Sequence, residues 1–271
     1  MQDPKPYSRR EILRLGAGSL LALGLWPGTV RAAGKSQPRN FSFIVVNDIH
    51  YFDDHCGDWL QGALRKMKSH PEHPDFCVLA GDLAESGTPA QLTAVRDLFK
   101  TLGIPVFCVP GNHDYVTYSD LKPYEQIFPK SINYHFDHKG WQFVALDTTQ
   151  GQTAFPTLIQ PPTLKWVDDT LPGLSKTRPL VILTHFPLGT GVIVRPTNAD
   201  LLLDRFRDYN LQAAFSGHWH GFTESHIRKI TLTTNKCCSF HAHNHDGSTE
   251  KGYFLCSARD GLVSRTFVQV G

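Results

Sequence analysis

The 271-residue sequence lacks several features that would assign it to a class directly. Its longest apolar stretch, Leu15 to Trp26, is too short and too rich in glycine to span a bilayer, which takes roughly 20 apolar residues. We therefore expect no stable membrane span after the N-terminal segment is cleaved. None of the six cysteines lies in a C-x-x-C arrangement, so a thiolate zinc site is not expected. Nothing in the composition indicates disorder, collagen or a repeat array.

The excess of positive over negative charge is confined to the first 32 residues. The formal net charge of the whole chain is +2. Residues 1–32 contain five Lys or Arg and two Asp or Glu, a net charge of +3, so the remainder carries 2 − 3 = −1. A body with this charge has no field that would attract nucleic acid, and we expect no nucleic-acid partner.

The N-terminal segment has the pattern of an export signal. Arg9 and Arg10 lie in a motif that resembles the twin-arginine consensus, an apolar stretch follows, and Ala32-Ala33 offers small side chains for cleavage. We expect residues 1–33 to be a twin-arginine (Tat) signal peptide that engages the Tat export machinery. The protein would then be periplasmic or secreted. The alternative is an ordinary amphipathic helix with two surface arginines.

An oxidising compartment would permit disulfides. Cys77 and Cys108 lie inside apolar, strand-like runs and are expected in the core. The remaining cysteines could pair in several ways that the sequence leaves open: Cys56, Cys237, Cys238 and Cys256.

The body of the chain, residues 41–271, alternates strand and helix patterns and is expected to form one domain. A helix is expected over 58–69, and a second one starts at Thr88, a capping residue followed by Pro89. These helices separate three apolar strands, at 41–46, 76–80 and 105–109. A βαβαβ order favours a parallel sheet with right-handed crossovers.

The second half is richer in strands. Helices are expected over 163–171 and 198–209. Further strands are predicted at 132–136, 142–146, 180–183 and 212–215. The chain is expected to end in a meander of antiparallel strands, at 226–234, 252–257 and 262–269.

Five short segments carry side chains that bind divalent cations, and four of them directly follow an apolar run. Ligands of parallel sheets gather at the carboxyl ends of the strands. Mixed nitrogen and oxygen ligands suit Mn, Fe, Zn or Co better than Mg or Ca. The pattern therefore predicts a paired-metal site in which Asp82 can bridge two cations. The segments are Asp48-Ile49-His50, Gly81-Asp82, Gly111-Asn112-His113-Asp114, Thr184-His185 and Gly217-His218-Trp219-His220.

In this order, D-x-H, G-D, G-N-H-D, H and G-H-x-H resemble the calcineurin-like metallophosphoesterase superfamily over residues 41–220. The resemblance implies an α/β fold, a sandwich of two mixed β-sheets flanked by helices, and two divalent metal ions. It implies that the first metal is held by Asp48, His50, Asp82 and His220. It implies that the second metal is held by Asp82, Asn112, His185 and His218.

The resemblance also implies catalytic roles within one segment. His113 would lie just outside the metals and act on the phosphate or its leaving group, and Asp114 would orient His113. Asn112 would help the metals to stabilise charge on the non-bridging oxygens while a metal-bridging hydroxide attacks phosphorus in line.

Glu85 narrows the resemblance. It stands three residues after Asp82, where purple acid phosphatases carry a Tyr that binds ferric iron, so a tyrosinate-iron site is not expected. Residues 81–87 look more like bacterial class III cyclic-nucleotide and glycerophosphodiester phosphodiesterases. We expect hydrolysis of a small organic phosphodiester. The alternatives are a phosphomonoesterase (including a protein phosphatase-like one), a nuclease, which the charge disfavours, and a non-catalytic metal-binding module, which the presence of His113 disfavours.

Other residues are less informative. Three alternating histidines are expected in a polar loop, although they could also line the substrate pocket or bind an adventitious metal: His241, His243 and His245. Three aromatic residues could stack on a base or aryl group, or serve only in packing: Tyr115, Phe155 and Trp219. The long loop 148–162 is of the kind that shapes specificity.

Overall fold

The computed structural model describes residues 38–271, which form one unit. The expected signal peptide, residues 1–33, lies outside this part of the chain. No helix in the described part combines the length and the apolarity that a membrane crossing requires.

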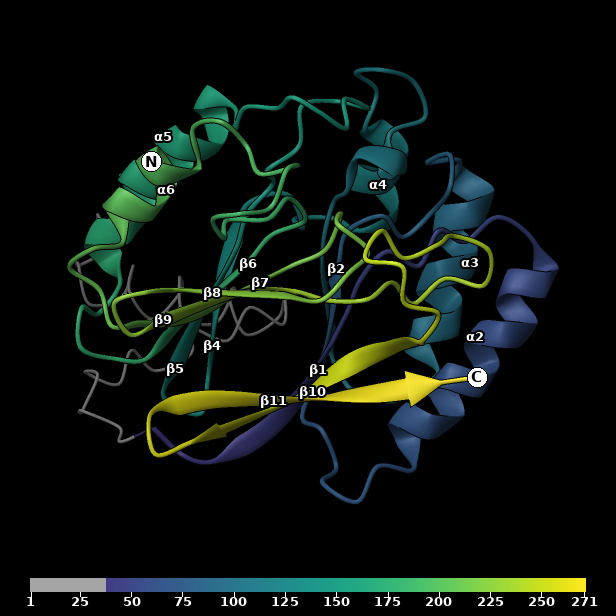
Figure 1. Ribbon diagram of the computed structural model, residues 1–271, viewed down its shortest axis with the longest axis horizontal. Coiled ribbons are helices and arrows are strands. Elements are labelled where there is room, and N and C mark those ends of the chain that lie inside the picture. The colour runs from purple at the N-terminus through teal and green to yellow at the C-terminus, as the bar shows by residue number, and fades with distance from the viewer. Residues whose placement is uncertain (1–37) are drawn as a thin grey trace, which may run out of the picture. The chain divides into compact units, whose positions relative to one another are not determined.

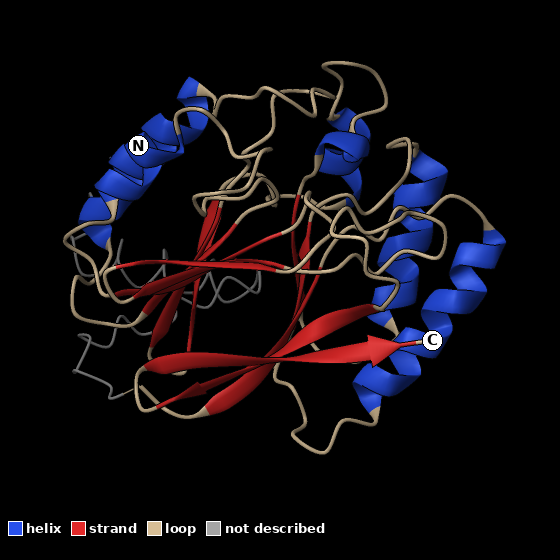
Figure 2. Cartoon of the chain, viewed as in Figure 1, coloured by secondary structure: helices blue, strands red, loops and turns tan. Residues whose placement is uncertain are grey.

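Two mixed β-sheets form the centre of the unit, and helices cover the outer side of each (Figure 1, Figure 2). This arrangement confirms the expected sandwich. The five-stranded sheet has the order β11-β10-β1-β2-β3. Its strands are β1 (Phe41–Val46), β2 (Cys77–Ala80), β3 (Val106–Val109), β10 (Lys251–Arg259) and β11 (Leu262–Val270).

The six-stranded sheet has the order β4-β5-β6-β7-β9-β8. Its strands are β4 (Tyr134–His138), β5 (Trp141–Ala145), β6 (Leu180–Leu183), β7 (Leu211–Ser216), β8 (Thr223–Ile227) and β9 (Ile230–Thr234). The five-stranded sheet is covered by α2 (Asp54–Lys68), α3 (Pro89–Lys100) and α4 (Lys122–Ile127), and the six-stranded sheet by α5 (Pro161–Thr170) and α6 (Ala199–Arg205). Two 3-10 turns complete the elements, η1 (Asn112–Asp114) and η2 (Leu171–Gly173).

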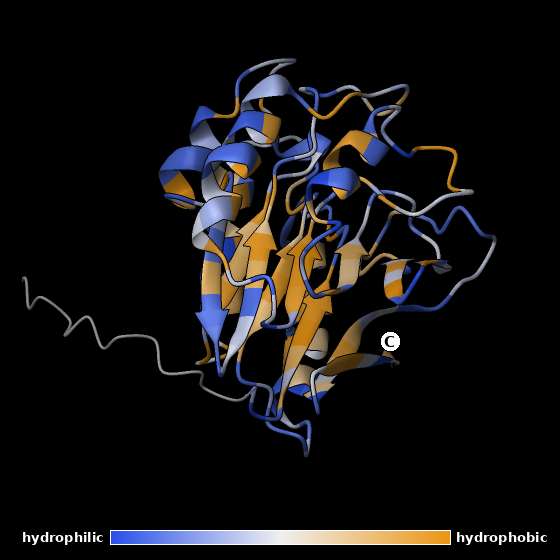
Figure 3. Cartoon of the chain, turned by 90° about the vertical axis from the view of Figure 1, so that its left-hand side faces the viewer, coloured by the Kyte–Doolittle hydropathy of each residue, from blue (hydrophilic) through white to orange (hydrophobic). Residues whose placement is uncertain are grey.

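Each central strand is apolar on both faces because each face meets a different core. In β1, Phe43 and Val45 pack between the two sheets, whereas Ile44 and Val46 pack under the helices of the first sheet. Successive side chains of a strand point to opposite faces, so one continuous apolar run supplies two cores. Figure 3 shows the apolar strands inside and hydrophilic helix surfaces outside.

The first half of the chain folds as the sequence predicts. β1, β2 and β3 pair in parallel, with α2 and α3 as the crossovers. The Thr88 side chain accepts a hydrogen bond from the backbone N–H of Gln91 at 3.3 Å, and Pro89 is the first residue of α3. The local capping signal and the global pairing therefore agree.

The predicted C-terminal meander is wrong. Residues 223–234 form the β8–β9 hairpin, and β9 pairs in parallel with β7 in the six-stranded sheet. β10 and β11 form a second hairpin, and β10 pairs with β1 in the other sheet. The strand patterns were recognised, but the partner of each strand depends on contacts far away in the sequence. The connection after β9 therefore crosses from one sheet to the other.

All six cysteines lie in the described part of the chain, and all are buried and free. Cys77 and Cys108 are core residues, as expected, under the helices of the five-stranded sheet. Cys256 faces the core between the sheets. Of the pairings left open by the sequence, the structure contains none.

Candidate metal centre

The carboxyl ends of five parallel strands bring the predicted segments together. β1, β2 and β3 end directly before three of them, and β6 and β7 end directly before the other two. The two sheets face each other, so side chains from both converge at one edge of the sandwich. Of the seven candidate ligands, all are buried: Asp48, His50, Asp82, Asn112, His185, His218 and His220.

Five of these candidates adopt a left-handed backbone conformation, which is uncommon for residues other than glycine. They are half of the ten non-glycine residues with positive φ among those described. Such conformations cost roughly 1–3 kcal/mol each and cluster at functional sites, because the surrounding structure must hold them. The five residues, with their φ angles, are Asp48 (51°), His50 (48°), Asp82 (50°), His218 (64°) and His220 (45°).

Two glycines let the strand ends approach closely. A Cβ atom on Gly81 would lie 2.3 Å from Nδ1 of His185, and one on Gly111 would lie 2.1 Å from Oδ1 of Asp82. No real Cβ contact is so short. The glycine before each of these ligand segments is therefore required by the space that the ligands occupy.

The candidate ligands form two groups that share Asp82. The first group contains Asp48, His50, Asp82 and His220, and the second contains Asp82, His185 and His218. Within each group, the potential ligand atoms all lie within 4.8 Å of one another.

The oxygen that joins the groups is Oδ2 of Asp82. It lies 3.5 Å from Nε2 of His50 and 3.3 Å from Nε2 of His185. Asn112 belongs beside the second group, since its Oδ1 lies 3.2 Å from Nε2 of His185. The structure thus brings together all seven predicted ligand residues.

Each of the four histidines uses one ring nitrogen for an outer partner and points the other nitrogen at its group. Such outer partners fix the orientation of metal-binding imidazoles. The outer bonds run from His50 Nδ1 to Glu85 Oε2 (2.8 Å), His185 Nδ1 to the Ala80 carbonyl (3.0 Å), His220 Nδ1 to the His243 carbonyl (3.0 Å) and His218 Nε2 to the Ala154 carbonyl (2.9 Å).

The buried carboxylates change the pKa values of the imidazoles around them. Burial lowers the pKa of His185, but the charges of Asp82 and Asp48 outweigh this effect and raise that pKa to about 9. The pKa of His220 is raised to about 9 against its burial, chiefly by Asp48. Burial lowers the pKa of His218 to about 4, with a further contribution from the charge of His185. The negative charges of Asp48 and Asp82 thus favour positive charge in the site, whether on protonated imidazoles or on metal cations.

His113 lies at the border of the site and is partly exposed. Its backbone N–H donates to Oδ1 of Asp82 at 2.9 Å, and its ring lies 4.6 Å from the ring of His50. Nδ1 lies 3.0 Å from the backbone carbonyl oxygen of Glu85, which holds the ring in place.

The expectation that Asp114 orients the His113 ring is wrong. Both Asp114 oxygens accept hydrogen bonds from backbone N–H groups. The carboxylate therefore holds the strand-end loops together and makes no hydrogen bond to the His113 ring. Burial and the charge of Asp82 raise the pKa of Asp114 to about 7, although the backbone donors oppose the shift. The three N–H groups that donate to it are those of Leu83 (2.9 Å), Ala84 (2.9 Å) and Gly111 (2.8 Å).

Glu85 is the site residue that the sequence did not reveal. Its carboxylate contacts Nδ1 of His50 at 2.8 Å and Nε2 of His241 at 3.3 Å, and it lies 3.9 Å from Nδ1 of His113. The hydrogen bond from His50, opposed by partial burial, lowers the pKa of Glu85 to about 2. The only signal in the sequence was a carboxylate three residues after a candidate ligand, in the same strand-end loop.

The loop with three alternating histidines contacts the site with backbone and ring atoms. The ring of His245 stacks on that of His220 at 4.9 Å, and His241 contacts Glu85. Of the three aromatic candidates, Tyr115 is buried and contacts Thr149, so it is a packing residue. Trp219 packs against His245, with ring centroids 5.4 Å apart. Phe155 is 53% exposed and follows Ala154, which bonds to His218.

Comparison with known proteins identifies the family. Residues 41–222 match the calcineurin-like phosphoesterase family. A probable cyclic nucleotide phosphodiesterase of Synechococcus sp. is 31% identical over 163 residues, which are 56% of this chain and 60% of that protein. A glycerophosphodiester phosphodiesterase of Enterobacter lignolyticus is 26% identical over 175 residues, which are 60% of this chain and 62% of that protein. The match thus spans about three-fifths of the length of these two curated relatives.

A solved structure confirms the fold. A purple acid phosphatase from yellow lupin superposes with a TM-score of 0.65 over 87% of this chain and 52% of that chain. The sequence identity of that superposition is 13%, so the likeness concerns the arrangement of sheets and helices.

Proposed function

The chain belongs to the calcineurin-like phosphoesterase family, and we propose that it is a metal-dependent phosphodiesterase that hydrolyses a small organic phosphodiester. Two curated relatives are named as a probable cyclic nucleotide phosphodiesterase and a glycerophosphodiester phosphodiesterase, which supports a diester as the substrate. The match covers 60% and 62% of the length of those proteins, so a diester substrate is a proposal for this chain.

One observation carries the proposal: two groups of buried nitrogen and oxygen donors meet at Oδ2 of Asp82. The donors are carboxylates and imidazoles whose outer nitrogens are already bonded, which leaves the inner atoms free for cations. A carboxylate placed between two groups of donors can bridge the two ions of a two-metal site. The donor set therefore fits two metals of the Mn, Fe, Zn or Co type.

The proposed assignment follows the two groups. The first metal would be held by Asp48, His50, Asp82 and His220. The second would be held by Asp82, His185 and His218, with Asn112 as a further oxygen donor. When bound, such a metal pair supplies Lewis acidity that activates water and stabilises negative charge on a phosphoryl group.

His113 has the position of a proton donor in this proposal. Its Nδ1 is engaged by the Glu85 carbonyl, so Nε2 is the ring nitrogen available to the leaving oxygen of a substrate. Asn112 would bind a non-bridging oxygen from the same turn, η1. Asp114 would keep that turn in shape through its three backbone hydrogen bonds.

The test is removal and return of metal. The chelator-treated protein should be inactive, and Mn, Fe, Zn or Co, added singly with elemental analysis, should restore activity with close to two ions per chain. Bis(p-nitrophenyl) phosphate should be cleaved with a higher kcat/KM than p-nitrophenyl phosphate. A preference for the monoester would favour a phosphatase. A protein that binds two ions but cleaves no phosphoester in a broad panel would instead be a non-catalytic metal-binding module.

We also propose that residues 1–33 direct export through the Tat machinery and that residues 41–271 are the exported phosphoesterase domain. The support is the Arg9-Arg10 motif and the apolar stretch after it. Replacement of both arginines by lysine should leave the protein in the cytoplasmic fraction of a Tat-competent bacterium. Unchanged fractionation of that variant would contradict the proposal.

A further inference from the structure

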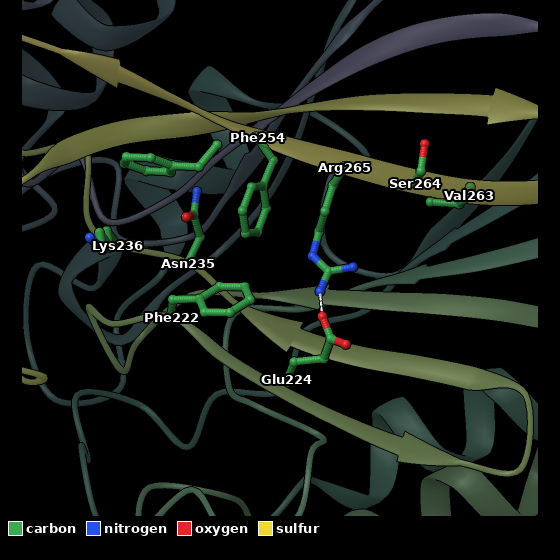
Figure 4. A pocket seen from close by; sticks show the side chains of 9 residues that line it. Phe222, Glu224, Asn235, Lys236, Phe254, Val263, Ser264 and Arg265 are labelled. Carbon is green, nitrogen blue, oxygen red and sulfur yellow. Dashed lines mark hydrogen bonds and ion pairs between the residues drawn. The ribbon is translucent and has the colours of Figure 1, made fainter.

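One cavity formed by the described residues lies away from the candidate metal centre. It has a volume of about 560 Å³ and opens between the two sheets at the edge formed by β8 and β11 (Figure 4). Among the described residues, both are the terminal strands of their sheets. The volume lies within the range of small-molecule sites, about 300–1,000 Å³.

The wall of the cavity is aromatic. Phe222 and Phe254 stand nearly perpendicular to each other, with centroids 6.2 Å apart, and Phe267 packs against Phe254 at 6.5 Å. The guanidinium of Arg265 lies 5.7 Å from the ring of Phe222 and 5.6 Å from that of Phe254. Aromatic walls can contact a further aromatic ring in offset-stacked or edge-to-face geometry.

The charges of the cavity are already paired. Arg265 on β11 forms an ion pair with Glu224 on β8, which links the two sheets. Lys236 forms an ion pair with Glu250 at 2.8 Å. With both cations neutralised, the cavity does not select a phosphate or another strongly charged group.

Two polar groups in the lining have unused hydrogen-bonding capacity. Asn235 is 1% exposed, and neither its Nδ2 nor its Oδ1 has a partner among the described residues. In Figure 4 its amide lies beside the ring of Phe254, and Phe222 is drawn below. Nε of Arg265 is likewise buried and unpartnered within this part of the chain. Buried polar groups without partners are rare and costly, and each calls for an explanation.

We propose that this cavity, here called the inter-sheet pocket, binds an uncharged planar aromatic ring that carries a hydrogen-bond donor next to an acceptor. The carboxamide of Asn235 pairs with such an edge through two hydrogen bonds, while Phe222 and Phe254 contact the ring. Nucleobases and aromatic carboxamides share this chemistry. The site is separate from the metal centre and does not depend on the proposed hydrolysis.

The experiment measures binding of adenosine and of nicotinamide to the full chain by calorimetry and saturation-transfer NMR. At least one probe should show saturable binding. Binding of adenosine alone indicates a nucleobase ligand, and binding of nicotinamide alone indicates a carboxamide ligand. Phe222→Ala should weaken binding about tenfold, the usual scale for loss of one stacking ring.

Phe240→Ala is the matched control. Phe240 is 53% exposed and Phe222 is 47% exposed, but Phe240 does not line the pocket. The control should bind within twofold of the unmodified protein. Asn235→Ala, checked for folding by circular dichroism, should also weaken binding. The proposal is overturned if neither probe binds, or if Phe222→Ala and Phe240→Ala bind equally well.

Discussion

The two groups of candidate ligands share one carboxylate but are held in place by different means. In the first group, His50 depends on a charged side chain, that of Glu85. In the second group, His185 and His218 depend on the backbone carbonyls of Ala80 and Ala154. A backbone carbonyl persists whatever side chain its residue carries, whereas a carboxylate is lost by one substitution. The first group is therefore the one that single substitutions can tune.

The first group is also the one beside the proposed proton donor. The ring of His113 lies 4.6 Å from that of His50, and Glu85 lies within reach of both. The second group is enclosed instead by Asn112 and by the loop that carries Ala154. The proposed proton donor, His113, and the carboxylate of Glu85 thus lie on the same side of the site, next to the first group.

Asp82→Ala should have the largest effect, because Asp82 is the residue that the two groups of described ligands share. We expect loss of metal from both groups and a fall in kcat/KM of more than about 10³-fold, since a single stabilising group at a reacting centre is worth about 10²–10³. Elemental analysis and diester hydrolysis measure the two effects. Asp208→Ala, at an exposed surface ion pair, is the control. Full activity of Asp82→Ala would show that the two groups do not depend on a shared carboxylate.

His113→Ala should separate chemistry from metal binding. The side chain is outside the described ligand groups around Asp82, so both metals should remain. Loss of the proton donor should lower kcat by about 10²–10⁴ for a substrate with a poor leaving group. A fall smaller than about tenfold, with metal content kept, would exclude the role of a general acid.

The His113 prediction also shows how far the sequence reached. Strand ends placed the five segments at one edge of the sheets, and the family resemblance named the seven candidate ligands among their residues. They could not predict which groups orient the ligands. Asp114 is next to His113 in sequence, but its Oδ1 accepts hydrogen bonds from a loop 30 and 31 residues away, at Ala84 and Leu83, and its Oδ2 accepts one from Gly111. Glu85 appeared to be only a replaced tyrosine.

The partners of the C-terminal strands were predicted wrongly for the same reason. An apolar pattern predicts a strand, but the choice between the two sheets is made by long-range packing. The sequence did not predict the inter-sheet pocket either. Its lining residues Phe222, Asn235 and Arg265 form no motif, and folding of the β8–β9 and β10–β11 hairpins brings them together.

Glu85→Gln tests the difference between the groups directly. The amide keeps the size of the side chain but loses the charge that orients and polarises His50. Substitution of such outer partners typically costs 10–100-fold in metal affinity. We expect this loss for the first metal alone, measured by competition with a metal indicator.

His243→Ala is the matched control for Glu85→Gln. The partner of His220 is the backbone carbonyl of His243, and that carbonyl survives the substitution. We expect metal affinity within about threefold of the unmodified protein. Equal losses in the two variants would mean that backbone and side-chain partners are equivalent, contrary to the comparison.

The smallest expected effect is a loss of folding stability that leaves metal binding unchanged. Thr88 caps α3 through the backbone N–H of Gln91 and contacts neither ligand group. Thr88→Ala should lower the free energy of unfolding by about 1 kcal/mol, seen as a fall in Tm of about 2–4 °C. Metal content and kcat/KM should not change. If Thr88→Ala lost metal as Glu85→Gln is expected to, the losses in both variants would reflect weaker folding, and the distinction between a tunable first group and a backbone-held second group would fail.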